Sequence, residues 1–473
     1  MLTLWQQLTA KYVKIYRLVS IQVPEESLYK YQTASYWKDY IPSVYRDFNL
    51  DLESTSTLNA KHSRKMMVRA PGDMEWSVTH KPDWVTVTPS SGTGKVEVTI
   101  LFDEMVRGNG NRADSLVFKP TAYDYHKSVK VDQYDYPYDS GDVIINQTAT
   151  VGNGVNIVFM GDCFDAKDIA EGYYEEIMNE AIGHFFAIEP YNTYRDYFNV
   201  YSVFGMSADS GMGTANTIRE ARFGSQYSLT EGVMPDFETI FAGACKAPID
   251  DNVATTLIIL VENTNECNGF CALWEDGSAV AIATMSTDPA PRDFRGVIHH
   301  EAGGHGFGKL ADEYIYHNGF VSFCKICDKD LRPEINEMKS YGFYTNISLS
   351  GNMHDVPWSH FIYDPQYSNV VDVYEGAYMH TRGVWRSEAT SCMNNNIPYY
   401  NAISRESMVK RIMKYADEEY SFEAFKALDH ESLPSILSTR TWDGVSSTSG
   451  SSQFEQRPPK FMGEKPKFDK KKF

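Results

Sequence analysis

The stretch VIHHEAGGHGFGKLADEY, residues 297–314, brings two histidines, a glutamate and two neighbouring acidic residues into a short segment. A hydrolytic zinc site needs two neutral imidazoles on one rigid element, a carboxylate beside them, and a third ligand that leaves one coordination position open. His300, Glu301 and His305 supply the first three groups. The stretch therefore predicts one catalytic zinc ion on a helix, and the surrounding domain has to be built to hold that helix.

The spacing of the two histidines departs from the usual one. Residues four apart share a face of an α-helix, which is why zinc-binding helices commonly read H-E-x-x-H. His300 and His305 are five apart, and a regular helix would separate them by roughly 140°. A π-type turn absorbs one extra residue, and we expect it at Gly303 and Gly304, where glycine lowers the cost of deforming the backbone. His299 is a poorer ligand, because the residue four positions later is a glycine.

The segment after the helix offers the third ligand. Gly308 stands where the chain can reverse, and LADEY follows at residues 310–314. Asp312 and Glu313 are the available oxygen ligands. We favour Asp312, because a short carboxylate suits a tight turn, and keep Glu313 as the alternative.

Apolar runs alternate with helical patterns on both sides of this motif. The sequence predicts buried strands at 155–161, 198–204, 255–261 and 279–285, and helices at 167–187, 401–415 and 420–428. Such alternation is typical of an α/β (α+β) domain, here with a mixed, mostly parallel sheet next to the active-site helix. We assign residues 139–442 to this domain.

The run from NIVFMGD through FNVYSVF, HHEAGGHGFGKLADEY and SCMNN resembles the catalytic domain of the IgA peptidase family of zinc metallopeptidases, over roughly residues 140–430. Many members carry HExGHxxxGLxDEY, and this chain has one glycine more before its second histidine. The resemblance implies a metzincin-like fold, in which Met393 lies in the Met-turn beneath the metal.

The same resemblance implies endopeptidase activity, one zinc ion and secretion. Glu301 would act as general base, taking a proton from the zinc-bound water and later delivering one to the leaving amine. A neighbouring donor should stabilise the oxyanion. The candidates are Tyr314, Tyr378, His380 and Arg386, among which the sequence does not choose.

Upstream, short alternating runs separated by Pro, Gly and Asn clusters predict an all-β sandwich over residues 51–138. The stretch from Met74 to Glu104, followed by RADSLVF, resembles the BACON-type modules that precede enzymes in Bacteroidetes. That resemblance implies a spacer or a glycan-binding module. We favour the spacer, because Trp76 and Trp84 lie in predicted strands, where tryptophan usually faces the core.

The two ends of the chain give weaker patterns. Residues 1–50 show no clear period and form a poorly defined lead-in. Residues 443–473 pass from GVSSTSGSS to KPKFDKKKF, a composition that buries little apolar surface, so we expect a disordered tail.

Composition sets outer limits on the function. The 473 residues include 44 Lys plus Arg and 63 Asp plus Glu, and a formal net charge of −19 repels nucleic acid. No stretch approaches the roughly 20 apolar residues of a transmembrane helix. Seven cysteines, with one lone CKIC at 324–327, favour structural roles over a zinc ribbon. No export signal is legible, so a secreted, periplasmic or cell-surface location follows from the family resemblance alone.

Three functions remain in competition. The first is a zinc-dependent endopeptidase that hydrolyses peptide bonds of extracellular proteins or glycoproteins. The alternative is a catalytically inactive glycan-binding surface protein, possessing its sugar site in the N-terminal sandwich; an intact Glu301 argues against it. The third is a structural protein held by zinc, which would need four closed protein ligands.

Overall fold

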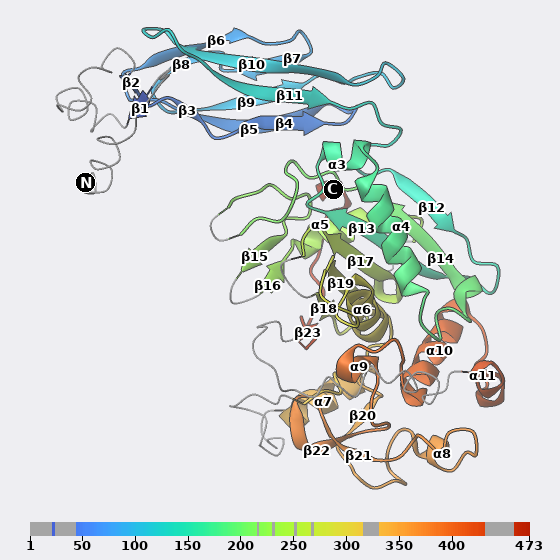
Figure 1. The fold of residues 1–473 in the computed structure, drawn as a ribbon. Helices are drawn as coiled ribbons and strands as arrows, with labels where there is room; N and C mark the ends of the chain where they lie inside the picture. The colour runs from blue at the N-terminus through green and yellow to red at the C-terminus, as the bar shows by residue number, and fades with distance from the viewer. Residues whose placement is uncertain are drawn as a thin grey trace, which may run out of the picture. The chain divides into compact units, whose positions relative to one another are not determined.

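The computed structural model describes residues 21–23, 44–214, 217–228, 232–249, 253–265, 269–315, 331–430 and 458–473. The chain divides into two compact units, Met1–Pro137 and Tyr138–Phe473 (Figure 1). Most of the predicted lead-in, all of CKIC and residues 443–457 of the predicted tail lie outside the described residues.

The first unit is a sandwich of two sheets. One sheet has the order β4 (Ser54–Thr57), β11 (Lys127–Gln133), β10 (Arg112–Pro120), β6 (Glu75–His80) and β8 (Ser91–Thr93). The other has the order β3 (Asn49–Leu50), β5 (His62–Arg69), β9 (Val96–Phe102) and β7 (Val85–Thr88). A parallel pair, β1 (Ile21–Val23) and β2 (Val44–Arg46), stands apart from both. Alternate residues of the two sheets face one shared core.

The two tryptophans that the structure describes in this unit, Trp76 and Trp84, are packed against other side chains. Trp76 is 1% exposed and its indole N–H donates to the carbonyl of Gly94 at 3.1 Å. The ring of Trp84 is covered by the guanidinium of Arg112, 4.6 Å from the ring centroid. Neither ring offers the open face on which a sugar stacks.

The sandwich also begins earlier than the sequence predicted. Phe48 is fully buried in its core and β3 pairs with β5, although both fall in the stretch expected to be a lead-in. The buried phenylalanine immediately precedes a weakly apolar strand of two residues, which is too short to give a period.

The second unit is a mixed α/β domain around a seven-stranded sheet. Its order is β12 (Val143–Gln147), β14 (Phe198–Val203), β13 (Val155–Asp162), β17 (Leu257–Glu262), β19 (Ala279–Thr284), β18 (Phe270–Leu273) and β23 (Lys460–Phe461). The four strands from β14 to β19 are parallel, and β18 runs antiparallel to β19. The four predicted strand runs are confirmed as β13, β14, β17 and β19.

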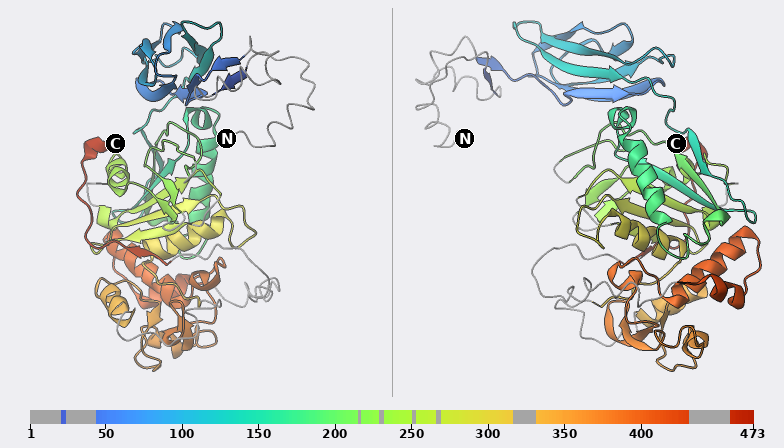
Figure 2. Two further views of the ribbon diagram at one scale, coloured as in Figure 1. Left: turned by 90° about the vertical axis from the view of Figure 1, so that its left-hand side faces the viewer. Right: turned by 45° about the vertical axis from the view of Figure 1, so that its right-hand side comes forward.

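Helices cover both faces of this sheet (Figure 2). On one face α5 (Phe237–Ala244) packs on side chains of β13 and β17. On the other lie α4 (Tyr173–Phe185) and the continuous pair α6 (Phe294–Val297) and η4 (Ile298–Phe307). The single helix predicted over 167–187 is divided into α3 (Ala166–Ala170) and α4, because Gly172 adopts a left-handed φ of 86° between them.

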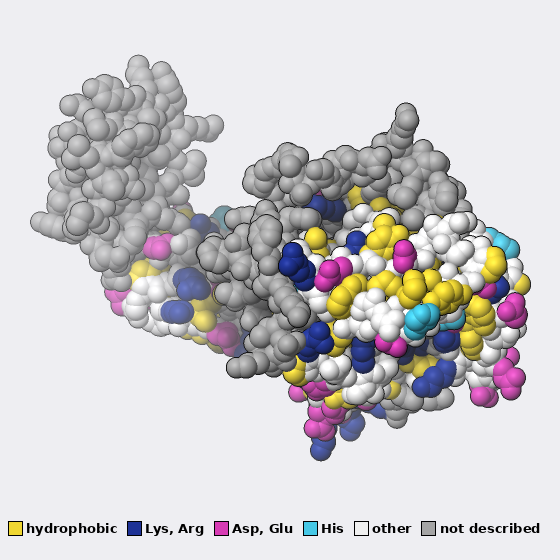
Figure 3. Space-filling model, turned by 90° about the horizontal axis from the view of Figure 1, so that it is seen from below, with side chains coloured by type: hydrophobic (Ala, Val, Ile, Leu, Met, Phe, Trp, Pro, Cys, Tyr) yellow, Lys and Arg dark blue, Asp and Glu magenta, His cyan; other side chains and the backbone are white. Residues whose placement is uncertain are grey.

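The remaining elements complete the unit. Near the sheet are η2 (Arg195–Tyr197), β15 (Gln226–Ser228), β16 (Gly232–Met234) and η3 (Val253–Thr255). After η4 come α7 (Leu331–Ser340), β20 (Ile347–Ser348), α8 (Ser359–Ile362), β21 (Tyr374–Ala377), β22 (His380–Arg386), α9 (Cys392–Asn395), α10 (Ala402–Ala416) and α11 (Phe422–Leu428). From below, this part shows acidic and basic side chains interspersed with hydrophobic ones (Figure 3).

The expectation of a disordered tail is wrong for residues 458–473. They form β23 and a short 3-10 helix, η5 (Lys470–Lys472). Met462, Phe468 and Phe473 pack against the hydrophobic core on the α5 side of the sheet. The composition of the segment misled the prediction, because its few apolar residues find a core supplied by the rest of the domain.

Among the described residues, no helix combines the length and apolar character needed to cross a bilayer.

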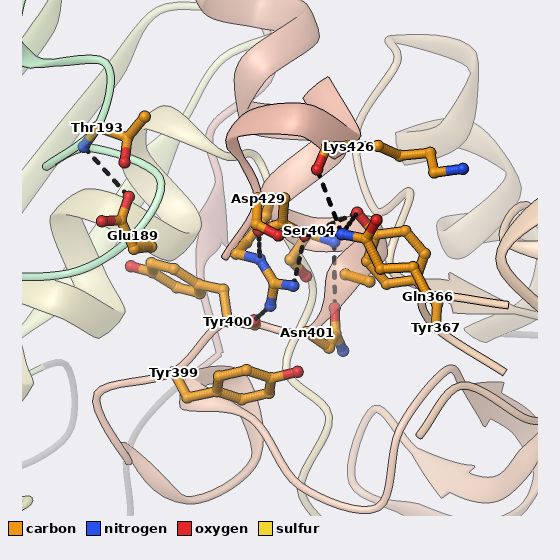
Figure 4. Close-up of polar contacts among 12 residues, drawn as sticks. Glu189, Thr193, Gln366, Tyr367, Tyr399, Tyr400, Asn401, Ser404, Lys426 and Asp429 are labelled. Carbon is orange, nitrogen blue, oxygen red and sulfur yellow. Dashed lines mark hydrogen bonds and ion pairs between the residues drawn. The ribbon is translucent and has the colours of Figure 1, made fainter. Parts of the chain in front are cut away.

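A buried ion pair fixes α10 against the end of α11. The guanidinium of Arg405 donates to both carboxylate oxygens of Asp429, at 2.7 and 2.8 Å, and to the carbonyl of Tyr400. Figure 4 shows Asp429 and Tyr367 at this cluster, and the ring of Tyr400 pointing away from Asp429. The hydroxyl of Tyr367 donates to Asp429 at 3.0 Å.

Replacing one partner of this pair should be costly. Arg405→Ala leaves a buried carboxylate without its cation, so we expect the free energy of unfolding to fall by about 3–5 kcal/mol. Lys410→Ala removes a half-exposed partner of Glu406 on the same helix and should cost less than about 1 kcal/mol. Urea denaturation measures both, and equal losses would contradict this assignment of the stabilising contact.

Candidate metal centre

The helix that carries the two histidines is a π-helix over its whole length, Ile298–Phe307, and all of its residues are buried. It is continued by a bond from the amide of Gly308 to the carbonyl of Gly303, five residues earlier, at 2.9 Å. The predicted π-type turn is therefore confirmed. The π-helical region is longer than predicted, because it begins at Ile298, before the two glycines.

Side chains from distant segments press on the two glycines. A Cβ atom at position 304 would lie 2.2 Å from Sδ of Met393, and one at position 303 would lie 2.3 Å from the hydroxyl of Tyr400. The hydroxyl of Tyr191 donates to the carbonyl of Gly303 at 2.6 Å. Close packing and π-helical geometry thus both require glycine at positions 303 and 304.

The larger number of residues per π-helical turn brings the imidazoles of His300 and His305 together. Their ring centroids are 4.7 Å apart, and both side chains are fully buried. Nδ1 of His300 lies 3.2 Å from the carbonyl of Cys392, and Nδ1 of His305 lies 2.8 Å from the carbonyl of Leu310. A carbonyl oxygen accepts only, so each Nδ1 carries a proton and each neutral ring presents the lone pair of Nε2.

One carboxylate oxygen of Asp312 lies close to the Nε2 atoms of both histidines. Its Oδ1 lies 3.0 Å from Nε2 of His300 and 3.3 Å from Nε2 of His305. Burial alone would raise the pKa of Asp312, but His305 and His300, if protonated in the absence of a metal ion, outweigh it and lower the pKa to about 2. Nε2 of His305 and Oδ2 of Asp312 are buried and have no hydrogen-bond partner among the described residues.

These three residues fit a metal ion. A tetrahedral zinc ion with bonds of about 2.0 to 2.1 Å separates its ligand atoms by roughly 3.3 Å, close to the separations here. Two nitrogen lone pairs and a carboxylate facing one point repel one another unless a cation lies between them. The donor set, two neutral imidazoles and one carboxylate, is one that zinc accepts in catalytic sites.

Glu313 is held away from this point by other contacts. Its carboxylate accepts from the amide of Asn401 at 2.7 Å, the amide of Asn346 at 2.9 Å and the hydroxyl of Ser391 at 2.5 Å. Its own amide donates to the carbonyl of Met393 at 2.8 Å. Glu313 therefore ties the DEY segment to the SCMNN segment and to the start of α10, where Asn401 is labelled in Figure 4.

Glu301 lies beside these candidate ligands, and its carboxylate is not engaged by the described residues. Both of its oxygens are buried and have no hydrogen-bond partner in the described part of the chain. Burial raises the pKa of Glu301 to about 8, with His300 opposing the shift and Asp312 adding to it. Its Cγ lies close to Gly269, where a Cβ would come within 2.9 Å, so Glu301 borders the start of β18.

Met393 lies beneath the ligand helix. It is fully buried, its Sδ faces Gly304, and the preceding carbonyl, that of Cys392, orients His300. His299 points elsewhere: its Nε2 lies 2.8 Å from the carbonyl of His184, and burial lowers its pKa to about 4.

The four oxyanion candidates make contacts of different kinds. Backbone hydrogen bonds hold Tyr378 and Tyr314, and the side chains of Tyr378, His380 and Arg386 bind other protein groups. The amide of Tyr378 donates to the carbonyl of Asp312 at 3.0 Å, while its hydroxyl donates to Glu334 at 2.5 Å. Nδ1 of His380 lies 2.5 Å from the carbonyl of Tyr378. The guanidinium of Arg386 donates to the carbonyls of Gly376 and Ala389. The carbonyl of Tyr314 accepts from the amide of Met379 at 2.9 Å.

Sequence reasoning missed Tyr344. It is buried, its ring centroid lies 5.7 Å from that of Tyr378, and its amide donates to the carbonyl of Lys309 at 2.8 Å. Burial and the nearby Asp312 carboxylate raise the pKa of its phenol. Nothing in its local sequence distinguishes it from the other tyrosines.

A second buried cluster joins Asp162, Cys163 and Glu262 at the ends of β13 and β17. Asp162 accepts from the amides of Cys163, Phe223 and Ser225 and from the hydroxyl of Ser207. Glu262 accepts from the hydroxyl of Ser225 at 2.6 Å and from the thiol of Cys163 at 3.7 Å. Protein donors satisfy this cluster, so it has the character of a structural network.

Comparison with known families agrees with the class of site. The family model described as IgA Peptidase M64 matches residues 143–335, a range that includes the ligand helix and Asp312. The match indicates a metallopeptidase domain. This part of the chain is assigned to the IgA peptidase family, as the resemblance in its sequence implied.

Other comparisons add little. No curated protein matches the chain. A GH5 xyloglucanase of Bacteroides ovatus is 13% identical, with a TM-score of 0.18, over 46% of this chain and 45% of its own. A C. elegans MSP family member is 14% identical, with a TM-score of 0.15, over 18% of this chain and 94% of its own. No functional inference follows from either likeness.

The packing on Gly304 predicts a local sensitivity. Gly304→Ala places a methyl group against Met393, so we expect overpacking to lower the free energy of unfolding by about 1–3 kcal/mol. Gly183→Ala, in α4, meets nothing within 4 Å and should stabilise the helix by about 0.5–1 kcal/mol. Thermal and urea unfolding compare the two, and a neutral Gly304→Ala would mean that the helix does not need glycine there.

Proposed function

We propose that this protein is a zinc-dependent endopeptidase that hydrolyses peptide bonds of extracellular proteins or glycoproteins. The observation that carries the proposal is the convergence of Nε2 of His300, Nε2 of His305 and Oδ1 of Asp312, beside a buried carboxylate, Glu301, without a partner. The family match over residues 143–335 supports the same class of reaction.

In this proposal His300, His305 and Asp312 hold the ion and leave one position open. Bound zinc supplies Lewis acidity and lowers the pKa of a water molecule. Glu301 accepts the proton of the attacking water and passes it to the amine that leaves the scissile bond. Its buried, unpartnered carboxylate suits this role, because no neighbouring donor in the described part of the chain occupies the oxygen that accepts the proton.

The surrounding residues position this machinery. The carbonyls of Cys392 and Leu310 fix the orientation of the two imidazoles, and Met393 supports the helix from below in a metzincin-like arrangement. Tyr344, whose phenol lies near the Asp312 carboxylate, and its neighbour Tyr378 are the first residues to test as donors to the oxyanion. We further infer action outside the cytoplasm from the family resemblance, which cell fractionation tests.

The two acidic residues of the DEY segment should behave in opposite ways. Asp312→Asn should lower zinc content sharply, as should His300→Ala and His305→Ala, because each loses a ligand. Glu313→Gln should keep one equivalent of zinc but lose about 1–3 kcal/mol of stability, since an amide cannot accept from all three donors. Elemental analysis with urea unfolding separates them. Zinc retained by Asp312→Asn and lost by Glu313→Gln would reverse the assignment.

Glu301→Gln isolates the role of the base. The amide preserves the shape of the side chain but cannot accept the proton, so we expect hydrolysis of an unfolded protein substrate to fall by about 10² to 10⁴. Zinc content and unfolding temperature should stay those of wild type. Activity near wild type would transfer the role to another group, and loss of zinc would make Glu301 a structural residue.

A further inference from the structure

Residues 458–473, here called the strap, lie along the outer edge of β18. Lys460 and Phe461 pair in parallel with Ala272 and Leu273 of that strand. The amide of Met462 donates to the carbonyl of Leu273 at 2.8 Å, and the amide of Glu275 donates to the carbonyl of Gly463 at 3.1 Å. Figure 1 places β23 beside β18, between the sheet and α7.

Aromatic side chains of the strap pack against elements on both sides of this edge. Phe461 stacks on Tyr341, which follows α7, with centroids 5.5 Å apart. Phe468 stacks on Phe241 of α5 at 5.5 Å, and Phe473 stacks on Phe223 at 5.3 Å. The strap therefore connects the sheet with the part of the unit that follows η4.

Charge complementarity adds to this attachment. The strap carries six lysines and two acidic residues within a chain of net charge −19. Lys465 pairs with Asp276 at 2.8 Å, and Lys472 pairs with Asp236 at 2.7 Å and Glu238 at 2.9 Å. All of these pairs are partly exposed, so each contributes little and is screened by salt.

The edge that the strap covers leads to the candidate site. Glu301 borders Gly269, the residue before β18, and Ala272 follows three positions later, roughly 10 Å along an extended strand. In the described part of the chain, β18 has β19 on one side and β23 on the other. An extended peptide that lies at Glu301 and follows this sheet edge as far as Ala272 meets the backbone groups of β18 that the strap occupies.

We propose that the strap is an autoinhibitory segment, which competes with an extended polypeptide for the outer edge of β18 and is displaced when that polypeptide binds. The proposal rests on the proposed peptidase function, because it assigns the competing ligand to that site. It gives residues 458–473 a regulatory role and makes the strength of their attachment a determinant of activity.

The test compares strap variants of the zinc-loaded protein. One variant ends after residue 457. In the full chain, Met462→Pro removes the amide that donates to Leu273, and Met462→Leu keeps it as the matched control. Binding of fluorescently labelled, reduced and carboxymethylated lactalbumin is followed by anisotropy, and its hydrolysis is followed separately.

We expect the shortened chain and Met462→Pro to bind and to hydrolyse this substrate about tenfold better, the effect of a strap docked about 90% of the time. Met462→Leu should behave as wild type. A synthetic peptide of residues 458–473 should compete with the substrate for the shortened chain, less effectively at high salt. If the shortened chain unfolds, Met462→Pro decides.

The outcomes separate the two proposals. Unchanged binding and hydrolysis in Met462→Pro and in a folded shortened chain would overturn the autoinhibitory role, whatever the activity of the protein. Tighter substrate binding and peptide competition, with no hydrolysis by any variant, would leave the strap inference standing and refute the peptidase. Binding of the synthetic peptide without competition would show that the strap attaches outside the path of the substrate.

Discussion

The π-helical geometry of η4 is the constraint on which the candidate site depends. A regular α-helix would point His300 and His305 to different faces, and Asp312 could not face both. The wider π-helical turn is packed against side chains from other segments: Met393 lies against one glycine and Tyr400 against the other. The candidate metal site and the core beneath it therefore depend on the same packing, because a helix that relaxed toward α geometry would disturb both.

The sequence was most informative where spacing has a geometric meaning. The interval from His300 to His305, read with the two glycines, predicted the π geometry, and the four buried apolar runs predicted the parallel centre of the sheet. For the third ligand it favoured Asp312 over Glu313 on the length of the side chain alone. Contacts from far along the chain distinguish the two carboxylates. Asn346 and Asn401 donate hydrogen bonds to Glu313, whereas Asp312 faces the histidines.

Elements whose stability comes from distant partners were predicted poorly. The strap has a composition typical of disorder and becomes ordered because Phe468 and Phe473 find a core built by other segments. Strand β18 is short and carries no alternating pattern, yet it forms the edge that borders Glu301. Tyr344 gives no local signal. Composition and period describe what a segment does alone, and these features arise from contacts between segments.

The central claim is that His300, His305 and Asp312 together hold one zinc ion. X-ray absorption at the zinc edge of the purified protein tests it most directly. The account predicts a first shell of nitrogen and oxygen alone, with two imidazoles and bonds of about 2.0 to 2.1 Å, lost in His305→Ala. A sulfur ligand at about 2.3 Å, or an unchanged spectrum in His305→Ala, would place the metal elsewhere and contradict it.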